Sequence, residues 1–290
     1  MQWVQILILG LLLGGVYAMM ASGLTLLFGV MRVVNLAHAA FILIAAYITY
    51  VLFENLLLDP MLSIVITMPL MFGLGVVLYL LLFPRLEESP RYVEMTVLLT
   101  FGLALIVEGL ITFIFTGIFR SVRPEYAATS IHVGEFFIPT SQLYASLISF
   151  GLLICLWLVL RFTKTGTAIR ATMQNRAAAQ MVGVNVRRVS AIAFGMGMAL
   201  AGAAGSLLSF LFPFFPAKHW QWIALLLALI VLGGMGSIKG AVVGAVLLAV
   251  ASAFVTFWLG PTWSPVTFYL TLFLILMVRP QGLFGAKVRL

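Results

Sequence analysis

The stretch RFTKTGTAIRATMQNRAAAQMVGVNVRR (residues 161–188) is the one long break in an otherwise apolar chain. It carries six basic residues and no acidic residue, and apolar segments long enough to cross a bilayer flank it on both sides. Short loops between membrane spans collect Lys and Arg on the cytoplasmic face, so we expect this segment to be cytoplasmic. Ile169, Met173 and Ala177 lie one helical turn apart and Gly183 supplies a stop, which predicts a short amphipathic helix.

The function of this predicted helix has two interpretations. A loop that only sets the membrane topology needs a few basic side chains and no helix. Here the helix has a glycine at each end, Gly166 and Gly183, and one apolar face. We therefore favour a docking surface for a cytoplasmic partner over a loop that is merely solvated.

The composition is that of a polytopic membrane protein. Of the 290 residues, 63% are apolar and 8% are charged, whereas soluble proteins average about 25% charged residues. The net charge of +8 comes from short loops and from a basic tail with Arg279, Lys287 and Arg289, which indicates cytoplasmic loops and no nucleic-acid partner. The single Cys155 excludes an intrachain disulfide, and three scattered histidines offer no metal-ligand spacing.

Spans of about 20 apolar residues, the length needed to cross a bilayer, recur along the chain. They cover residues 3–30, 36–53, 61–83, 95–119, 143–160 and 189–212, and residues 223–278 allow up to three more. The sequence thus predicts an all-α transmembrane bundle of eight or nine spans in a single domain over residues 1–290. With nine spans the N-terminus lies outside. Polar residues 120–142 predict a small hairpin or loop on the outer face.

Motifs for catalysis or nucleotide binding are absent from the sequence. There is no G-x-x-x-x-G-K-[ST] loop, no H-E-x-x-H and no G-x-S-x-G. We therefore expect no catalysis and no bound cofactor in this chain. Energy for any transport must come from another chain or from an ion gradient.

Glu108 lies near the middle of the fourth predicted span, in FGLALIVEGLITFIF. An acidic side chain at this depth costs about 2.5–3.5 kcal/mol on insertion scales, and each Leu or Ile offsets only about 0.3–0.6 kcal/mol of that. Glu108 should therefore face the protein interior, water or a partner. A carboxylate that lines or gates a path and a hydrogen-bonded Glu that fixes helix packing both remain open.

Asn35 and His38, in RVVNLAHAAF, lie three residues apart at the start of the second span and share a helix face. Such a polar pair can line a path, or it can cap and pack a helix, since Asn is a favoured N-cap residue. The residue types and spacing of Asn35 and His38 favour a capping and packing role over a path-lining role. Small residues also recur at every fourth position and predict close helix packing; they are Gly10 and Gly14, then Gly197, Ala201 and Gly205, then Gly236, Gly240 and Gly244.

Five blocks of the sequence resemble one known family. They are GGVYAMMASGLTLLFGVMRVVNLAHAAF (residues 14–41), GTAIRATMQNRAAAQMVGVNVRRV (residues 166–189), AFGMGMALAGAAGSLL, GGMGSIKGAVVGA and RPQGLFG. In this order they are similar to blocks of the LivH-type permease subunits of ABC importers for branched-chain amino acids. The likeness covers nearly the whole chain, and five blocks in register make it specific.

The resemblance implies a bacterial cytoplasmic-membrane protein whose segment 161–188 is the coupling helix, seated in a groove of an ATP-hydrolysing subunit. It also implies a second, related permease subunit, two ATPase subunits that use ATP and Mg, and a periplasmic or extracellular binding protein. The expected coupling residues are Gly166, Thr167, Arg170, Ala171, Arg176, Gly183 and Asn185. The expected substrate path contains Asn35, His38 and Glu108; the first two match the family's opening signature.

Three residues depart from that signature: Leu36 replaces its Phe, Ala39 its Gly, and Ala40 the acidic residue that often follows. Urea, short amides and aromatic acids therefore stay open as substrates beside leucine, isoleucine and valine. A self-sufficient channel or an ion-coupled carrier that uses Glu108 is the rival function. An intramembrane enzyme has the least support, because no nucleophile and base are paired in the sequence.

Overall fold

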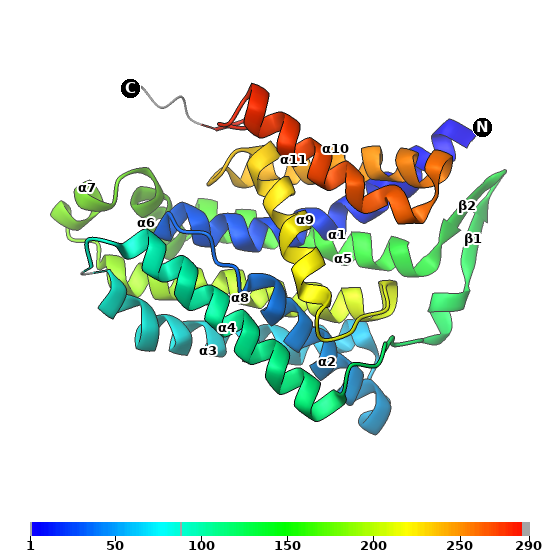
Figure 1. Ribbon diagram of the computed structural model, residues 1–290, viewed down its shortest axis with the longest axis horizontal. Coiled ribbons are helices and arrows are strands. Elements are labelled where there is room, and N and C mark those ends of the chain that lie inside the picture. Colours follow the sequence, from blue (N-terminus) through cyan, green and yellow to red (C-terminus); the bar gives the residue numbers. More distant parts are fainter. Residues whose placement is uncertain (1, 88, 286–290) are drawn as a thin grey trace.

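A computed structural model describes residues 2–87 and 89–285, which form a bundle of helices with one two-stranded hairpin (Figure 1). Lys287 and Arg289 of the basic tail lie outside these residues. The long helices are α1 (Gln2–Met31), α2 (His38–Leu56), α3 (Pro60–Leu86), α4 (Tyr92–Phe115), α5 (Thr140–Phe162), α8 (Val186–Leu211), α10 (Ile238–Leu259) and α11 (Ser264–Val278). The shorter elements are α6 (Lys164–Gln174), α7 (Arg176–Met181), α9 (Lys218–Gly233), β1 (Ser130–Val133), β2 (Phe136–Pro139) and the 3-10 turns η1 (Glu125–Ala128) and η2 (Pro261–Trp263).

The expected multi-span architecture is confirmed. Within the described residues, eight helices are long and apolar enough to cross a membrane, with η2 and α11 counted together, and α9 is a shorter apolar helix. The chain is therefore a multi-pass membrane protein, and eight or nine spans is the correct range.

The bundle has two distinct ends (Figure 1). Helices α6 and α7 lie at one, which we call the basic end. The hairpin of β1 and β2 lies at the other, the hairpin end, and was expected from the polar residues 120–142. There the backbone N–H of Phe137 donates to the side chain of Gln5 (3.0 Å), which fixes the start of α1 beside the hairpin.

Two halves of the chain, α1–α4 and α8–α11, have the same order of elements but run in opposite directions, with α5, α6 and α7 between them. Helix α1 runs from the hairpin end to the basic end, whereas α8 leaves the basic end. The halves interlock, because α3 packs along α8 and α10 packs along α1. Such inverted repeats occur in many transporter folds.

Each half contains a span followed by a six-residue segment, 32–37 or 212–217, that turns back into the bundle. The next helix, α2 or α9, then begins inside the protein. The residues before these helices adopt nearly the same conformation: Ala37 has φ −74° and ψ −8°, and Ala217 has φ −77° and ψ 0°. Irregular backbone at membrane depth needs protein cover. Here the N–H of Leu36 donates to Thr100 (3.2 Å), and Phe214 exchanges backbone hydrogen bonds with Arg120 (2.9 Å each).

Small residues bring the helices close together, as the sequence predicted. A Cβ atom at Gly10 would lie 2.7 Å from the backbone of Val250 in α10, and one at Gly205 would overlap the backbone of Ile42 in α2. For one of these small residues, the prediction of a place on a helix face was wrong. Gly236 lies in the loop before α10 with φ +85°, so it forms a turn and is not part of a helix face.

Candidate functional site

Helix α6 begins at the basic end after Thr163, whose hydroxyl accepts a hydrogen bond from the N–H of Gly166 (2.9 Å). With this cap the helix begins at Lys164, two residues before Gly166, where the sequence predicted its beginning. Gly166 lies so close to Leu160 of α5 that a Cβ atom would overlap the backbone there. With Ile169 fully buried, one face of α6 is packed against the bundle.

The prediction of one continuous helix was wrong, because the backbone leaves the helical region at Asn175 (φ −152°, ψ 107°). The side chain of Asn175 then caps α7 by accepting from the N–H of Ala178 (3.1 Å). Ala177, expected on the same face as Ile169 and Met173, is exposed on the second helix. The segment is thus a pair of short helices.

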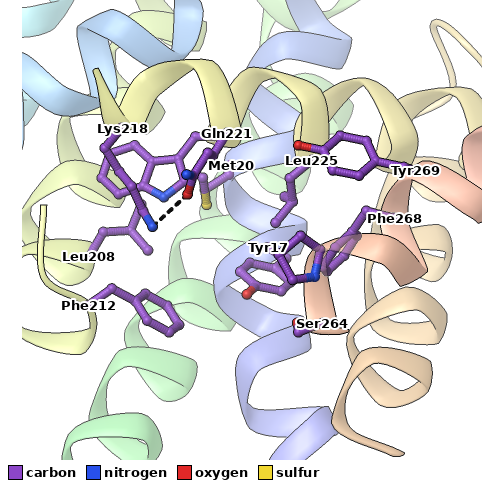
Figure 2. A pocket seen from close by; sticks show the side chains of 12 residues that line it. Tyr17, Met20, Leu208, Phe212, Lys218, Gln221, Leu225, Ser264, Phe268 and Tyr269 are labelled. Carbon is purple, nitrogen blue, oxygen red and sulfur yellow. Dashed lines mark hydrogen bonds between the residues drawn. The ribbon is translucent and has the colours of Figure 1, made fainter. Parts of the chain in front are cut away.

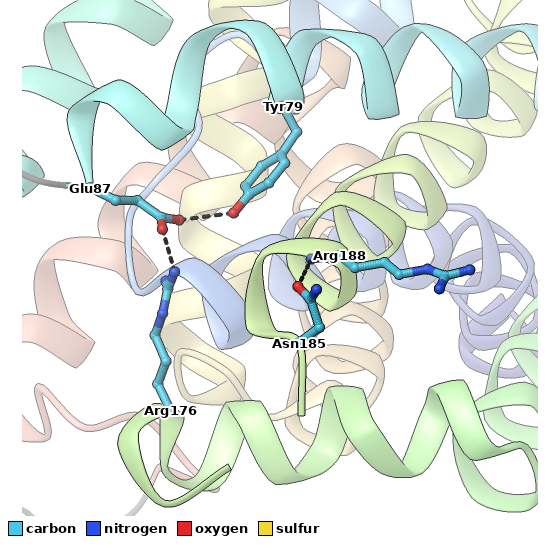
Figure 3. A network of polar contacts seen from close by, with 5 residues as sticks. All are labelled: Tyr79, Glu87, Arg176, Asn185 and Arg188. Atoms are coloured by element: carbon cyan, nitrogen blue, oxygen red, sulfur yellow. Dashed lines mark hydrogen bonds and ion pairs between the residues drawn. The ribbon is translucent and has the colours of Figure 1, made fainter. Parts of the chain in front are cut away.

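Two predicted coupling residues form the exit from α7. Gly183 has φ +86°, a conformation that glycine adopts without strain, and its N–H donates to the carbonyl of Gln180 (3.0 Å). The side chain of Asn185 caps α8 by accepting from the N–H of Arg188 (3.0 Å; Figure 3). A stop was expected at Gly183. The cap at Asn185 joins α7 to α8 through a short, ordered turn.

Arg176 points inward from the start of α7 and forms an ion pair with Glu87 at the end of α3 (Figure 3). The second carboxylate oxygen of Glu87 accepts from the hydroxyl of Tyr79 (2.9 Å). Burial lowers the pKa of Arg176, but the hydrogen bond and charge of Glu87 outweigh burial, so the pKa is raised overall. The guanidinium group therefore stays charged and ties α7 to α3.

The solvent-facing side of the α6–α7 pair combines cations with apolar side chains. Thr167 and Arg170 are exposed on α6, and Ala171 beside them is half-buried. Met181 and Val182, at the end of α7, are 82% and 79% exposed. We call the exposed residues Thr167, Arg170, Met181 and Val182 the basic-end surface. Two large, nearly fully exposed apolar side chains at a membrane protein's water-facing end are typical of a contact with another protein.

Asn35 and His38 lie together where the 32–37 segment meets α2, and both are buried. The Asn35 side chain accepts from the N–H of Ala37 (3.0 Å), while its amide nitrogen has no partner. The His38 ring lies against Gly23 of α1, where a Cβ atom would be 3.2 Å from it. Neither ring nitrogen has hydrogen-bond geometry to a protein atom, although the backbone of Met20 lies beside the ring.

Glu108 of α4 lies at the start of α9 and not beside Asn35. One of its carboxylate oxygens accepts from the indole N–H of Trp220 (2.9 Å) and contacts the ring nitrogen of His219 at 3.1 Å. The side chain is 25% exposed. This geometry favours the packing alternative, in which Glu108 anchors the first turn of a helix that begins inside the protein.

The sequence-predicted residues therefore fall in three places: the basic end, the start of α2 and the start of α9. Sequence reasoning missed the partners, Glu87, His219 and Trp220. In the sequence, Glu87 lies in the mixed-charge stretch PRLEESPRYVE (residues 84–94), and His219 and Trp220 lie in the aromatic stretch PFFPAKHWQW (residues 213–222). The sequence did contain a signal for His219 and Trp220, because a carboxylate inside a span, such as that of Glu108, requires a hydrogen-bond donor.

Comparisons with known proteins identify the family of this chain. A family described as the permease component of the branched-chain amino acid transport system matches residues 6–278. A probable branched-chain amino acid transport permease protein LivH of Methanocaldococcus jannaschii is 26% identical over 277 residues, covering 92% of this chain and 88% of that protein. The LivH permease protein of a high-affinity branched-chain amino acid transport system in Salmonella typhimurium is 25% identical over 304 residues (95% and 93%).

Among solved structures, PsaBC from Streptococcus pneumoniae in complex with Fab is similar, with a TM-score of 0.49 and 13% identity, over 97% of this chain and 93% of that chain. The family match spans both inverted halves and the α6–α7 pair between them. The chain therefore belongs to the family of permease components of branched-chain amino acid transport systems, the LivH-type ABC permeases.

Proposed function

We propose that this chain forms half of the translocation pathway of an ATP-driven importer in the bacterial cytoplasmic membrane. A second, related permease subunit supplies the other half. Two partner subunits bind ATP and Mg and carry out the hydrolysis, so this chain holds no cofactor of its own. A substrate-binding protein docks outside, at the hairpin end.

The observation that carries this proposal is the basic-end surface on the α6–α7 pair. It carries the exposed Arg170, in keeping with the basic residues on the cytoplasmic face of membrane proteins, and it exposes Met181 and Val182. In the proposed assembly these side chains lie in a groove of the ATPase subunit. Arg170 and Thr167 lie on the neighbouring helix and complete the contact.

Four connections carry a movement of this surface into the spans. Gly166 packs α6 directly on α5, and Met173 of α6 packs on Gly29 near the end of α1. Arg176 binds α7 to α3, and the cap at Asn185 continues α7 into α8. Helices α1 and α8 lead into the two segments that turn back into the bundle. A tilt of α6–α7 therefore changes the position of α2 and α9, which begin inside the protein after these segments and which we call the broken helices.

The substrate path is proposed to run beside these broken helices, with Asn35 and His38 among its residues. Both are buried and keep unpaired polar atoms, which suits a site that exchanges water for a polar solute. Glu108 is assigned a positioning role, because its carboxylate is engaged by His219 and Trp220. Because these contacts occupy the carboxylate, an ion-coupled carrier that protonates and deprotonates Glu108 has less support than the importer.

The proposed substrate is a branched-chain amino acid or a similar small solute, as the names of the relatives suggest. The positions that depart from the family signature lie in packed surroundings. Ala39 and Ala40 are fully buried, and Leu36 binds Thr100 through its backbone. These departures therefore act on helix packing around the start of α2.

The proposal is tested by reconstituting the chain with its partner subunits in proteoliposomes and measuring leucine uptake. We expect uptake that requires ATP, the ATPase subunits and the binding protein. Uptake by this chain alone, driven by an ion gradient, would establish the carrier instead.

A further inference from the structure

A cavity lies between α1, α8, α9 and α11 (Figure 2). It has a volume of about 130 Å³, roughly ten times the ~10–15 Å³ that one water needs by the same measure. Ser264 at the start of α11 and Phe212, directly after the end of α8, both line it. The cavity therefore belongs to the hairpin-end half of the bundle, the half that an incoming substrate reaches first.

Lys218, the first residue of α9, lines this cavity. The depth of α9 follows from its neighbour Glu108, which lies seven residues before the end of α4 at Phe115. At 1.5 Å per residue this places the start of α9 about 10 Å inside the bundle. The Lys218 side chain is half-buried and Gln221 beside it is exposed, so the cavity is open to the surface at its cationic end.

The only polar contact of the Lys218 ammonium among the described residues is the side-chain oxygen of Gln221 (2.8 Å; Figure 2). No described carboxylate lies within ion-pair distance of it. Glu108, close by along the chain, is occupied by His219 and Trp220. The ring of Phe215 lies 6.0 Å from the ammonium and supplies no charge. The positive charge is thus left without an anion.

The N-terminus of α9 adds to this positive field. Ala217 precedes the helix and has no side-chain acceptor to cap it, and the N-terminal end of a helix carries a partial positive charge. The cavity also has an apolar side, formed largely by aromatic rings: Trp222 and Phe268 line it. A cationic end and an apolar wall fit a molecule with a carboxylate at one end and an apolar body.

We propose that this cavity is a substrate subsite in which the Lys218 ammonium binds the carboxylate of a small organic acid with an apolar side chain. Gln221 holds the ammonium in place until the carboxylate arrives, and Trp222 and Phe268 contact the apolar body. This inference rests on the proposed function and sharpens it. It selects amino acids and aromatic acids, and it excludes urea and short amides, which carry no carboxylate.

The binding test uses the full chain in lipid nanodiscs and measures its thermal unfolding midpoint with L-leucine, phenylacetate, leucinamide and urea. We expect leucine or phenylacetate to raise the midpoint, and leucinamide and urea to leave it unchanged. Lys218→Gln should weaken binding at least about tenfold, the loss expected for a charge-assisted hydrogen bond. Lys218→Arg keeps the charge and should retain binding, and Lys239→Gln, an exposed lysine at the basic end, serves as the control.

Equal stabilisation by leucinamide, unchanged binding in Lys218→Gln, or no binding of either acid by the wild type would overturn the inference. Measuring ATP-dependent leucine uptake by the reconstituted complex distinguishes a failure of the subsite from a failure of the proposed importer function. Wild-type uptake in Lys218→Gln with ATP dependence intact refutes the subsite and keeps the importer. Carboxylate binding that needs Lys218, without any ATP-dependent uptake in the wild type, keeps the subsite and refutes the importer.

Discussion

The guanidinium group of Arg176 in α7 is hydrogen-bonded to the carboxylate of Glu87 at the end of α3. The two residues are 89 positions apart in the chain. Their side chains are 31% and 21% exposed, so the pair is partly shielded from water. In the proposed coupling mechanism, this pair passes a movement of α7 to α3, the span that packs along α8.

Glu87→Gln removes this ion pair and should impair transport more than stability. Partly exposed pairs contribute about 0.2–1 kcal/mol, so the unfolding free energy should fall by less than about 1 kcal/mol. Leucine uptake by the reconstituted complex should fall several-fold while the ATPase subunits still co-purify. The charge-exchanged variant Glu87→Arg with Arg176→Glu should recover part of the uptake. Full uptake by the single variant would show that the pair carries no force.

Gly183→Ala should disturb the turn between α7 and α8. A Cβ atom there meets no other atom, so the cost comes from the positive φ alone, about 1–2 kcal/mol. ATPase co-purification and uptake should both decline, because the exposed end of α7 changes direction. Gly134→Ala is the matched control, since Gly134 also has a positive φ (+62°) and open surroundings but lies in the hairpin. Equal effects of the two substitutions on co-purification would contradict the assignment.

Glu108→Leu should leave His219 and Trp220 without their acceptor. Each unpaired buried polar group costs about 1–3 kcal/mol, so the protein should unfold at a lower temperature and transport should be lost with it. Glu108→Gln keeps an acceptor oxygen and should retain most of the stability and uptake. If Glu108→Gln abolished uptake with stability unchanged, the charge itself would be required and the positioning role would be wrong.

The N-cap position of α2 is Ala37, which has no side-chain cap, so the predicted capping by Asn35 was wrong. Asn35→Ala should still weaken the turn before α2, because the buried N–H of Ala37 loses its acceptor, at a cost of about 1–3 kcal/mol. Asn35→Asp keeps that acceptor but introduces a charge at a buried position, at a cost of about 2.5–3.5 kcal/mol on insertion scales. Thermal unfolding in nanodiscs should therefore rank wild type above Asn35→Ala and Asn35→Ala above Asn35→Asp. The reverse order of the two variants would contradict the burial of the Asn35 side chain in this structure.

Periodicity and charge predicted the spans and the buried face of α6 at Ile169 and Met173, since these signals lie within one or two helical turns. The break at Asn175 could not be predicted in this way. Asn occurs both within helices and as a cap, and Arg176, the next residue, binds Glu87 in another part of the chain. Local sequence carries no information on that contact.

The broken helices were missed for a similar reason. Residues 32–37 and 212–217 follow apolar stretches directly, and the sequence predicted ordinary span ends there. Their irregular backbone is stabilised by distant groups, such as Thr100 and Arg120. The inverted repeat likewise has no fixed period in the sequence, because it relates helix directions and packing, and those need no shared residues. Among the candidate residues, Glu108 was expected to face the protein interior, water or a partner. Its carboxylate contacts His219 and Trp220, which were not identified.

The central claim is that the basic-end surface binds an ATPase subunit, and site-specific cross-linking in the assembled complex tests it most directly. Cys155 is exposed and must first be replaced by serine. Met181→Cys should then cross-link to the ATPase subunit, whereas Val133→Cys, an exposed residue of the hairpin, should not. Cross-linking from Met181→Cys alone is the predicted result. No cross-link from Met181→Cys, or an equal yield from Val133→Cys, would contradict the account.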